Sequence, residues 1–384
     1  MRADPNTRRA VVVGAGIGGL AAAVALSRRG WAVEILERSA AIGESGSGLT
    51  LWCNGLRALD SIGLGAEVRA RAMPETDAGI RNPRGRWLIR TDTAELTRRY
   101  GEVVMIPRSD LFDILRGAVA GLGIRTSIAV TGIEADGDRI TVRHGAGASH
   151  SDLVVGADGI HSVVREWVCP QAAPPRYTGL TAWRMITARP VPALREGGQS
   201  WGNGQQAGVI PLPDGRVYVF GAAAAPAGQR SPGNELGELR RRFGHWHEPI
   251  PALLDAVGED DVLRHDIYHL PPLRTFARGR AAVLGDAAHA MTPNMGQGAN
   301  QAIEDAVTLA ALLDRTGEIG AALVEYDRIR RPRTRRIAQR SRRIGRIAQL
   351  SSVPALGRDA ALLVTPGSVL LRGLGPALSW QPPR

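Results

Sequence analysis

The chain has 384 residues, of which 44% are hydrophobic, and a formal net charge of +11. All of its 48 Lys+Arg residues are arginines, and the absence of lysine excludes Schiff-base enzymes, pyridoxal enzymes and P-loop NTPases. Its length allows about two domains, and two cysteines, Cys53 and Cys169, indicate a reducing compartment rather than a disulfide framework.

Residues 1–9 are polar and lack the apolar core of a signal peptide, so we expect a short disordered tail before the first strand. No apolar stretch reaches about 20 residues, so we expect no spanning helix. The reducing compartment indicated by the two cysteines agrees with the cytoplasmic location that we expect.

The first motif, VVVGAGIGGLAAAVALSRRGWAVEILER at 11–38, predicts a strand over 10–13, a glycine turn and a helix. Gly14 permits the turn, Gly16 lets a pyrophosphate approach, and Gly19 lets the helix pack on the strand. The helix that opens at Ile17 and Gly18 points its free N–H groups at the phosphates.

A second strand, predicted over 32–36, ends in Glu37, which is followed by Arg38. A carboxylate at this offset binds ribose hydroxyls and repels a 2′-phosphate. The motif therefore predicts a site for the adenosine of FAD or NAD, not of NADP.

Strand-like segments with turn residues lie at about 71–100 and 171–275. They include RYTGLTAWRMIT, QQAGVIPLP and RVYVFGAA, and Pro-Asp-Gly at 213–215 separates the last two. This pattern predicts an antiparallel sheet with a tight turn.

Two further glycine motifs are DLVVGADGIHSVVR at 152–165 and AAVLGDAAHAMTPNMGQGANQAIEDA at 281–306. In the latter, a strand over 281–284 places Asp286 where ligands bind in an open α/β sheet, within reach of a second sugar or ribityl chain. The loop 293–298 then opens a helix at about 297–300, whose positive N-terminus suits an anion such as the N1–O2 edge of a reduced flavin.

A dense arginine run, DRIRRPRTRRIAQRSRRIGR, occupies 327–346. Ile337, Ile344 and Ala348 fall near helical spacing, so we expect the arginines to form the solvated face of a docked helix. We favour this interpretation over nucleic-acid or membrane binding. The remaining segment to 384 is expected to be helical and then Pro/Gly-rich, and no metal site is expected because the histidines are scattered.

The three motifs together resemble the class A flavoprotein aromatic hydroxylases, typified by para-hydroxybenzoate hydroxylase and salicylate hydroxylase. Two shorter segments also match, GSGLTLWCNGLRALDSIGL at 46–64 and IPRSDLFDIL at 106–115. The resemblance covers nearly the whole chain to about Arg346. It implies an α/β fold with a Rossmann-like FAD domain of glutathione-reductase type at 8–70, 101–170 and 276–330. It also implies an inserted antiparallel-sheet substrate domain at 71–100 and 171–275, and a C-terminal helical segment at 331–384.

The resemblance implies non-covalent FAD, NADPH or NADH as a transient co-substrate, and O2. A flavin C4a-hydroperoxide would deliver one oxygen atom to an aromatic, phenolic or polycyclic molecule. The expected cofactor-binding residues are Gly14, Gly16, Ile17, Gly18, Gly19, Glu37, Arg38, Gly48, Arg108, Asp158, Gly159, Arg165, Gly285, Asp286, Pro293, Gly296, Gln297, Gly298, Ala299 and Asn300.

Substrate choice is expected to lie in the sheet, with candidate lining residues Trp52, Trp183, Met185, Trp201, Gln206, Val209, Tyr218, Phe220 and Met291. Tyr218 and His289 are the catalytic candidates, although a histidine beside a glycine turn more often only holds that turn. Arg184 alternates to the face opposite Trp183 and Met185, and is either a surface charge or a flavin neighbour. Family members that take small anions often carry an arginine or histidine on the strand matching 205–210. Gln205 and Gln206 stand there in this chain, which favours a neutral substrate over a carboxylate or urate-like anion.

Three alternatives stay open. A flavin epoxidase and a Baeyer–Villiger-type monooxygenase would use the same fold, and a non-catalytic FAD-binding relative would keep the same motifs. A flavin halogenase is disfavoured, because its W-x-W-x-I-P segment and its lysine are absent from the sequence. Partners other than the small substrate, including nucleic acid, are not expected, and the chain is expected to be a monomer or a homodimer.

Overall fold

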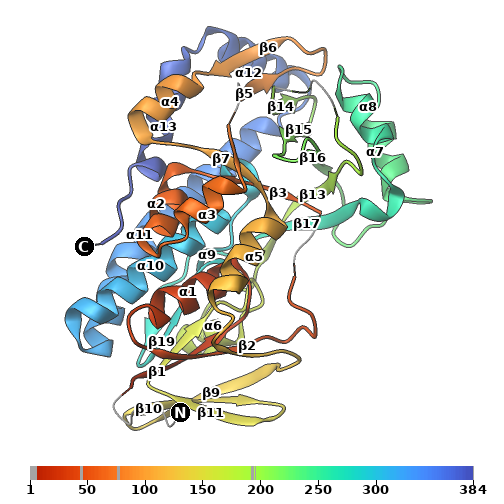
Figure 1. Cartoon of the computed structure of the whole chain (residues 1–384). Coiled ribbons are helices and arrows are strands. Elements are labelled where there is room, and N and C mark those ends of the chain that lie inside the picture. Colours follow the sequence, from red (N-terminus) through yellow and green to blue (C-terminus); the bar gives the residue numbers. More distant parts are fainter. Residues whose placement is uncertain (1–6, 44–45, 76–77, 192–193, 195, 384) are drawn as a thin grey trace.

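The structure is a computed structural model that describes residues 7–43, 46–75, 78–191, 194 and 196–383. The polar tail at 1–6 lies outside the described residues, and Arg9 already begins strand β1. Figure 1 shows two lobes joined by a long helix, with a glycine-motif lobe below and a sheet lobe above.

The lower lobe is built on a six-stranded sheet in the order β18-β19-β12-β1-β2-β8, which is parallel except for the β18–β19 pair. Its central strands are short apolar runs, as expected of strands buried on both faces. The strands are β1 (Arg9–Val13), β2 (Ala32–Leu36), β8 (Gly123–Arg125), β12 (Leu153–Gly156), β18 (Ala277–Arg278) and β19 (Ala281–Val283).

Helices and two small sheets complete this lobe. Helix α1 (Ile17–Ser27) follows β1 directly and packs against α10 (Gly298–Thr316) and α5 (Arg108–Ala118). A second group consists of α2 (Cys53–Ser61), α3 (Gly65–Ala70), α6 (Val163–Val168), α9 (Asp286–His289) and the 3-10 turn η2 (Pro293–Met295). The small sheets are β3 (Gly48–Leu51), β7 (Val104–Pro107) and β4 (Met73–Pro74), and β9 (Val130–Asp136), β10 (Arg139–His144) and β11 (Gly147–Ser151).

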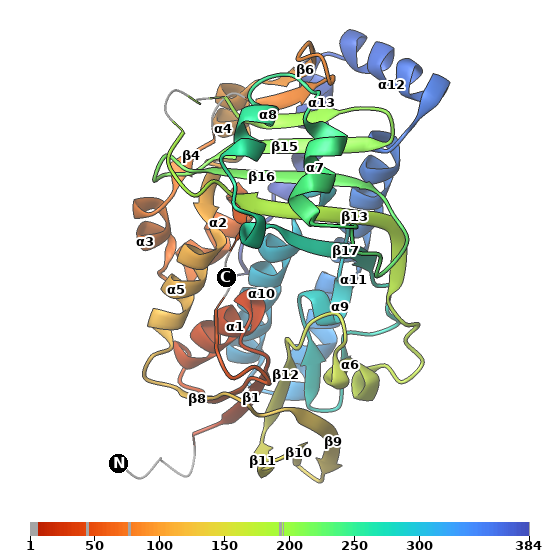
Figure 2. The ribbon, with the colours of Figure 1, turned by 90° about the vertical axis from the view of Figure 1, so that its right-hand side faces the viewer.

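The upper lobe is a seven-stranded sheet in the order β17-β13-β16-β15-β14-β5-β6. All its pairs are antiparallel except β14–β5, and the turn at 213–215 joins β15 to β16 as expected. The strands are β5 (Ala78–Arg81), β6 (Trp87–Thr91), β13 (Arg176–Ile186), β14 (Gly198–Trp201), β15 (Gln205–Pro211), β16 (Val217–Ala224) and β17 (Leu263–His269). Helices α7 (Glu235–Phe243) and α8 (Ile250–Asp255) cover its outer face, as Figure 2 shows, and the turn η1 (Glu259–Asp261) follows α8 in the chain. We propose that these two lobes are the FAD domain and the substrate domain.

The C-terminal part is helical almost to its end. Helix α11 (Ile319–Ala348) runs along both lobes, and α12 (Ser352–Val364), α13 (Gly367–Leu378) and α4 (Thr93–Tyr100) lie around the upper end. The expected Pro/Gly-rich tail is therefore mostly helix, because prolines at 354, 366 and 376 fall near helix starts or are accommodated within α13.

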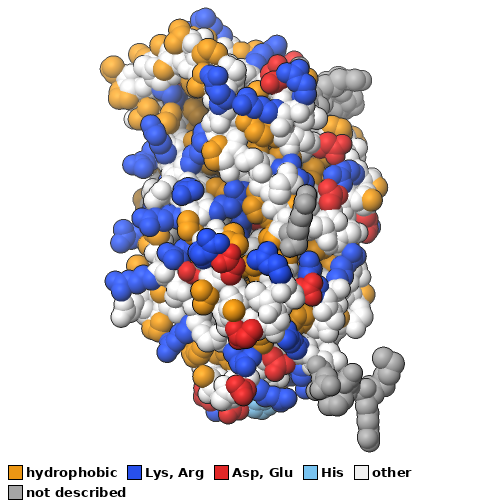
Figure 3. Space-filling view, turned by 90° about the vertical axis from the view of Figure 1, so that its left-hand side faces the viewer, with side chains coloured by type: hydrophobic (Ala, Val, Ile, Leu, Met, Phe, Trp, Pro, Cys, Tyr) orange, Lys and Arg blue, Asp and Glu red, His pale blue; other side chains and the backbone are white. Residues whose placement is uncertain are grey.

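The prediction for the arginine run is only partly right. Ile337 and Ala348 are buried, and Figure 3 shows basic side chains on the exposed side of the molecule that carries α11. Arg330, however, is fully buried, because the carboxylates of Glu304 and Asp305 face it from α10. Buried charges persist only when they are paired in this way.

Candidate functional site

The first glycine motif has the geometry of a phosphate-binding turn. Gly14 has φ +101°, and a Cβ there would lie 2.4 Å from the carbonyl oxygen of Ala157. A Cβ at Gly19 would lie 1.9 Å from the carbonyl oxygen of Gly14, so that glycine lets α1 pack on β1. A Cβ at Gly16, by contrast, would meet no atom within 4 Å. Since α1 also has no side-chain cap and no acid in its first turn, the space beside Gly16 suits an anion.

Glu37 is held in place at the end of β2. Its two carboxylate oxygens accept hydrogen bonds of 2.8 Å from the backbone N–H groups of Ala15 and Ser39. These bonds fix the carboxylate beside the glycine turn and leave lone pairs for ribose hydroxyls. Arg38, which follows, is exposed.

The side chains of the second motif bind the protein itself. Asp158 accepts hydrogen bonds from the Ser162 hydroxyl and from the backbone N–H groups of Val163 and Val164, so it caps α6. Burial raises the pKa of Asp158 against the effect of these bonds. Arg165 donates to the carbonyl oxygens of Ile160 and Ala287 and thereby joins the second motif to the third. The side chains of this motif therefore fix the local backbone shape between β12 and α6, where Gly159 has φ +78° in the turn.

The third motif presents a second uncapped helix start. Gly285 (φ +57°) precedes Asp286, and Gly296 (φ +59°) ends the 3-10 turn that begins at Pro293. Helix α10 has no side-chain cap and no acid in its first turn, and a Cβ at Gly298 would meet no atom within 4 Å. The backbone N–H groups from Gly298 and Ala299 onward are therefore available to an anion.

The side chains of Gln297 and Asn300 stabilise this helix start. Asn300 accepts from the backbone N–H of Trp52 (3.0 Å) and donates to the carbonyl oxygens of Thr50 (3.0 Å) and Gly296 (2.9 Å). Gln297 accepts from the Asn54 amide at 3.0 Å. The Trp52 indole N–H is buried beside Gly296 and has no hydrogen-bond partner among the described residues. It is therefore a donor placed against the loop without an acceptor.

Charged groups from both lobes converge near Tyr218. Arg184 donates to the Tyr218 hydroxyl at 3.2 Å, and a Cβ at Gly48 would lie 2.9 Å from the Tyr218 ring. Burial lowers the pKa of Arg108, Asp286 opposes that shift, and Arg184 reinforces it, so the three charges are neighbours. Of the two alternatives for Arg184, the structure supports an inward position facing the glycine-motif lobe.

The alternation of the sheet sorts the remaining candidates onto two faces. Trp201, Gln206, Tyr218 and Phe220 share one face, and the Phe220 ring covers Gly208. Trp183, Met185 and Val209 instead belong to the core under α7 and α8. The Trp183 indole donates to Glu235 at 2.7 Å. We therefore do not retain these three residues as substrate contacts. Met291 packs against a small apolar cluster that includes Met295 and Ile337.

A cluster of three amides joins the sheet to this loop, and only Gln206 among them was expected from the sequence. The Gln206 side-chain oxygen, which is buried, is 3.4 Å from the side-chain nitrogens of both Asn294 and Gln349. The side-chain oxygen of Gln349 is buried without a partner among the described residues. Asn294 stands inside the third motif, but nothing in the sequence places Gln349 beside it, since 55 residues separate them.

Comparisons with known proteins identify the family. Residues 7–341 match the family model described as FAD binding domain. The chain belongs to this family. It is 37% identical over 342 residues to aurachin C monooxygenase/isomerase of Stigmatella aurantiaca, covering 88% of this chain and 89% of that protein. It is 33% identical over 343 residues to an FAD-dependent urate hydroxylase of Klebsiella pneumoniae, covering 87% and 89%. The structure of Klebsiella pneumoniae HpxO complexed with FAD and uric acid aligns with a TM-score of 0.89 at 30% identity, over 97% of this chain and 96% of that one.

The expected fold class and cofactor are thereby confirmed, and the protein is an FAD-dependent monooxygenase. The geometry of the site also fits FAD independently of these comparisons. The features that suit an elongated anionic ligand are two uncapped helix starts, open space at Gly16 and Gly298, the fixed carboxylate of Glu37 and the indole of Trp52, which has no partner among the described residues.

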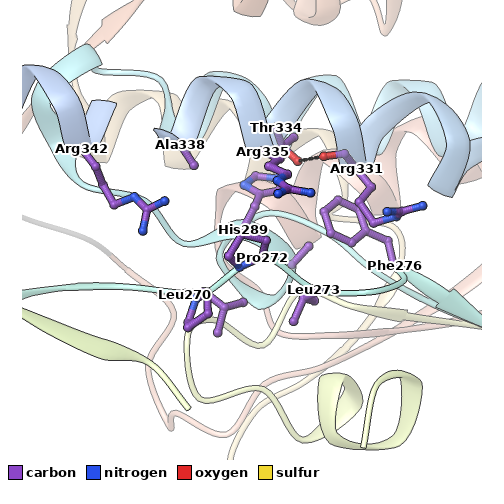
Figure 4. A pocket seen from close by; sticks show the side chains of 12 residues that line it. Leu270, Pro272, Leu273, Phe276, His289, Arg331, Thr334, Arg335, Ala338 and Arg342 are labelled. Atoms are coloured by element: carbon purple, nitrogen blue, oxygen red, sulfur yellow. Dashed lines mark hydrogen bonds between the residues drawn. The ribbon is translucent and has the colours of Figure 1, made fainter. Parts of the chain in front are cut away.

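The contacts of His289 are those of a residue that stabilises the fold. Its Nε2 lies 2.6 Å from a carboxylate oxygen of Asp305, and its ring packs near Phe276. Figure 4 shows it below α11, in a small pocket lined also by Leu270, Leu273 and Arg335. None of the residues that line this pocket comes from the first glycine motif or from the sheet face with Gln206 and Tyr218. We therefore do not retain His289 as a catalytic base.

Sequence reasoning missed the buried ionic network behind α10. Arg330 donates to Asp305 (2.6 Å), to Glu304 and to Gln301 (2.8 Å), and Asn54 donates to Glu304 at 2.6 Å. Although burial alone would raise the pKa of Asp305, the charges of Arg330 and His289 hold it at about 2. The signal was present as polar residues at 300, 301, 304, 305 and 308, which form one stripe on a helix. This network reaches Gln297 through Gln301 and so supports the N-terminus of α10.

Proposed function

We propose that this FAD-dependent monooxygenase hydroxylates a neutral aromatic or polycyclic ring that carries an oxo, hydroxyl or ring N–H group. The observation that carries the proposal is the amide cluster of Gln206, Asn294 and Gln349, which lies where the sheet meets the 293–298 loop. The two relatives described above act, by their names, on aurachin C and on urate.

The amide cluster favours a neutral ligand for a simple electrostatic reason. A buried amide both donates and accepts hydrogen bonds, but, unlike Arg184 beside Tyr218, the amide cluster supplies no charge to offset the desolvation of a carboxylate bound against it. The unpaired side-chain oxygen of Gln349 needs a donor, which a ring N–H or O–H provides. Trp201 and Phe220, on the same sheet face as Gln206, supply apolar surface for the rest of the ring system.

Tyr218 and Arg184 prepare the ring for oxygenation. The Tyr218 hydroxyl accepts a hydrogen bond from Arg184 and has its own proton free to donate to a ring oxygen. The positive charges of Arg184 and Arg108 favour the ionised form of a ring hydroxyl bound there. An ionised hydroxyl makes the ring more electron-rich, which is what an electrophilic oxygen transfer requires.

The cofactor would be held by the residues that the geometry leaves open to it. Gly16 and the start of α1 would bind the pyrophosphate, Glu37 the adenosine ribose, and the start of α10 with Trp52 the far end. When bound, FAD supplies the redox chemistry that takes electrons from NADPH or NADH and activates O2. The protein positions the ring and keeps water away from it.

We further propose a cytoplasmic location, since both cysteines are free and buried, and a monomer or a homodimer as the functional unit. Nucleic acid is not part of the proposed function.

The experiment that tests the substrate class measures NADPH and NADH oxidation by the FAD-loaded protein. The panel contains neutral phenols, quinolones, polycyclic quinones and polyenes, with aromatic carboxylates and urate as the anionic set. Hydrogen peroxide and product mass are read in the same wells. We expect ligand-stimulated oxidation and a product heavier by one oxygen only from the neutral aromatic set. Turnover of a carboxylate at micromolar affinity would overturn the neutral-substrate proposal, an epoxide or ring-expanded product would favour the alternative chemistries, and no stimulation by any ligand would favour a non-catalytic relative.

A matched pair of variants tests the role of the amide cluster. Gln206→Arg places a cation on the inner face, whereas Gln205→Arg places it on the neighbouring position of the opposite face. We expect the first to weaken binding of the neutral substrate by about 100-fold, through loss of the paired amide and burial of an unmatched charge. We expect the second to leave binding unchanged. Equal effects of both variants would show that Gln206 does not contact substrate.

A further inference from the structure

Helix α12 carries an apolar stripe that faces solvent. Val353, Leu356, Leu363 and Val364 are 77%, 70%, 42% and 81% exposed, and their spacing places them on one side of the helix. The inner side of the same helix holds Ala355 and Arg358, both buried. A helix on a globular surface ordinarily has the reverse arrangement, so the stripe marks a binding face.

The apolar face extends beyond α12. Ile347, near the end of α11, and Val369, on α13, are 38% and 44% exposed. No single helix in the described part of the chain is long and apolar enough to cross a bilayer, and α12 meets α13 at an angle of 96°. This sharp bend, with α13 packed on α2 and α4, suits a helix that lies on a surface rather than one that spans it.

Basic residues border this face. The second half of α11 exposes Arg335, Arg336, Arg343 and Arg346, and none of them forms an ion pair with another residue in the described ranges. The positive charge of Arg346 also lowers the pKa of Arg342, whose own burial is the larger cause. In Figure 3 hydrophobic side chains cap the upper left of the molecule, where α12 lies, and a column of basic side chains runs below them along α11.

We propose that α12 and the end of α11 dock this protein on an anionic lipid bilayer surface, with the stripe Val353, Leu356, Leu363 and Val364 inserted among the headgroups. Exposed apolar residues beside unpaired arginines are the composition that binds anionic membranes, and each basic residue adds to the attraction. A second copy of the chain is a poorer occupant, because a symmetric contact through α12 would bring two arginine columns together.

Helix α12 contacts the turn that leads into the strand carrying Gln206, so docking through α12 would affect the proposed substrate site. The turn between β14 and β15 is clamped to α12 by three contacts. Asn203 accepts from the backbone N–H of Ser352 (2.6 Å), Arg358 donates to the carbonyl oxygen of Gly202 (3.1 Å), and the Arg358 guanidinium lies 5.7 Å from the centre of the Trp201 ring. Gln206 is the second residue of β15, the strand that follows this turn. A docked protein would therefore hold the amide end of its sheet near the bilayer, where an apolar aromatic substrate accumulates.

Vesicle co-sedimentation of the FAD-loaded full chain tests the proposal and does not depend on turnover, so it can fail or succeed separately from the proposed function. The vesicles are phosphatidylcholine alone, or phosphatidylcholine mixed with phosphatidylglycerol. We expect binding to the mixed vesicles that weakens as salt is raised, and little binding to the neutral ones. Absence of binding to the mixed vesicles, or equal binding to both, would overturn the proposal.

Two pairs of variants assign the binding to this surface. Leu356→Glu with Val364→Glu should weaken vesicle binding at least about tenfold, whereas Val324→Glu should not, since Val324 is 71% exposed but lies near the other end of α11. Arg343→Gln with Arg346→Gln should weaken it about tenfold, whereas the exposed pair Arg139→Gln with Arg315→Gln should not. Equal losses from target and control variants would contradict the proposal. So would self-association without vesicles that the Leu356/Val364 variant abolishes, because a second copy would then cover the stripe.

Discussion

Replacing Gly16 by alanine should separate cofactor binding from folding more cleanly than any other change in the first motif. Gly16 has φ −74° and ψ 179°, which alanine adopts without strain, and a Cβ there would meet no protein atom within 4 Å. At Gly19 a Cβ would lie 1.9 Å from the backbone oxygen of Gly14, so α1 and β1 would have to move apart. The two substitutions add the same methyl group to the same turn and should fail in different ways.

The magnitudes follow from these contacts. Gly16→Ala should change the free energy of unfolding of the apoprotein by between zero and about +1 kcal/mol, because alanine restricts the unfolded chain. In the proposed site its methyl group would occupy the space of the pyrophosphate and remove about two charge-assisted hydrogen bonds from the start of α1. Losing them costs about 3 kcal/mol or more, so the Kd for FAD should rise at least about 100-fold. Gly19→Ala should lower the free energy of unfolding by about 3 kcal/mol or more, since backbone atoms cannot give way locally.

The assay pairs thermal unfolding of each apoprotein with an FAD titration followed by flavin fluorescence quenching. We expect Gly16→Ala to melt as the parent protein does and to bind FAD poorly, and Gly19→Ala to melt earlier. If Gly16→Ala bound FAD with parental affinity, the pyrophosphate would not lie at α1 and the assignment of the first motif would be wrong. If it also melted early, its phenotype would be one of folding and the separation would fail.

The remaining predictions concern the buried network, a perturbed acid and the substrate side of the site. Arg330→Met should cost about 3–5 kcal/mol of stability in chemical denaturation, since it leaves Glu304 and Asp305 buried with less positive charge, and a loss below about 1 kcal/mol would show that the network is not stabilising. Burial raises the pKa of Glu75 to about 7, so its folded-state pKa is above its unfolded value and stability falls as pH rises from about 4.5 to 7. Glu75→Gln should therefore stabilise the protein by about 1–3 kcal/mol above neutral pH and by almost nothing below about pH 4.5, and a gain independent of pH would refute this. Tyr218→Phe should bind FAD normally but release several-fold more hydrogen peroxide per NAD(P)H consumed, and unchanged coupling to product would remove Tyr218 from the site.

The parts of the fold that the sequence predicted are those where the backbone itself must have a particular shape. Gly14 takes a positive φ, and Gly19 allows a helix to approach within contact of a turn, so only glycine is accommodated. Strand β2 has the predicted bounds, with Glu37 directly after its last apolar residue, Leu36. The uncapped start of α10 could likewise be placed, since a glycine-rich loop leads directly into a segment of helical character.

The parts that could not be predicted depend on which face of an element meets which neighbour. Trp183, Met185 and Val209 alternate correctly with Arg184 and Gln206, but alternation alone does not tell which face α7 and α8 cover. The amide of Gln349 comes from a helix end that only the tertiary fold brings beside Gln206. The burial of Arg330 could not be predicted from the arginine run, which we interpreted as a solvated helix face. A pattern of charge gives no indication of a carboxylate pair on another helix.

This contrast explains why the cofactor can be predicted from the sequence and the substrate cannot. FAD is recognised mainly by helix starts and main-chain N–H groups, which require glycines at fixed spacings and therefore leave motifs. In the proposed site the substrate contacts single side chains on a sheet, and exchanging Gln206 for an arginine there would alter the preferred charge of the ligand without disturbing any strand pairing. The same reasoning applies to α12, whose outward stripe contributes nothing to the core and is free to vary with the place where the substrate is found. A relative that takes a highly water-soluble substrate should therefore keep the three glycine motifs and present polar residues on this helix.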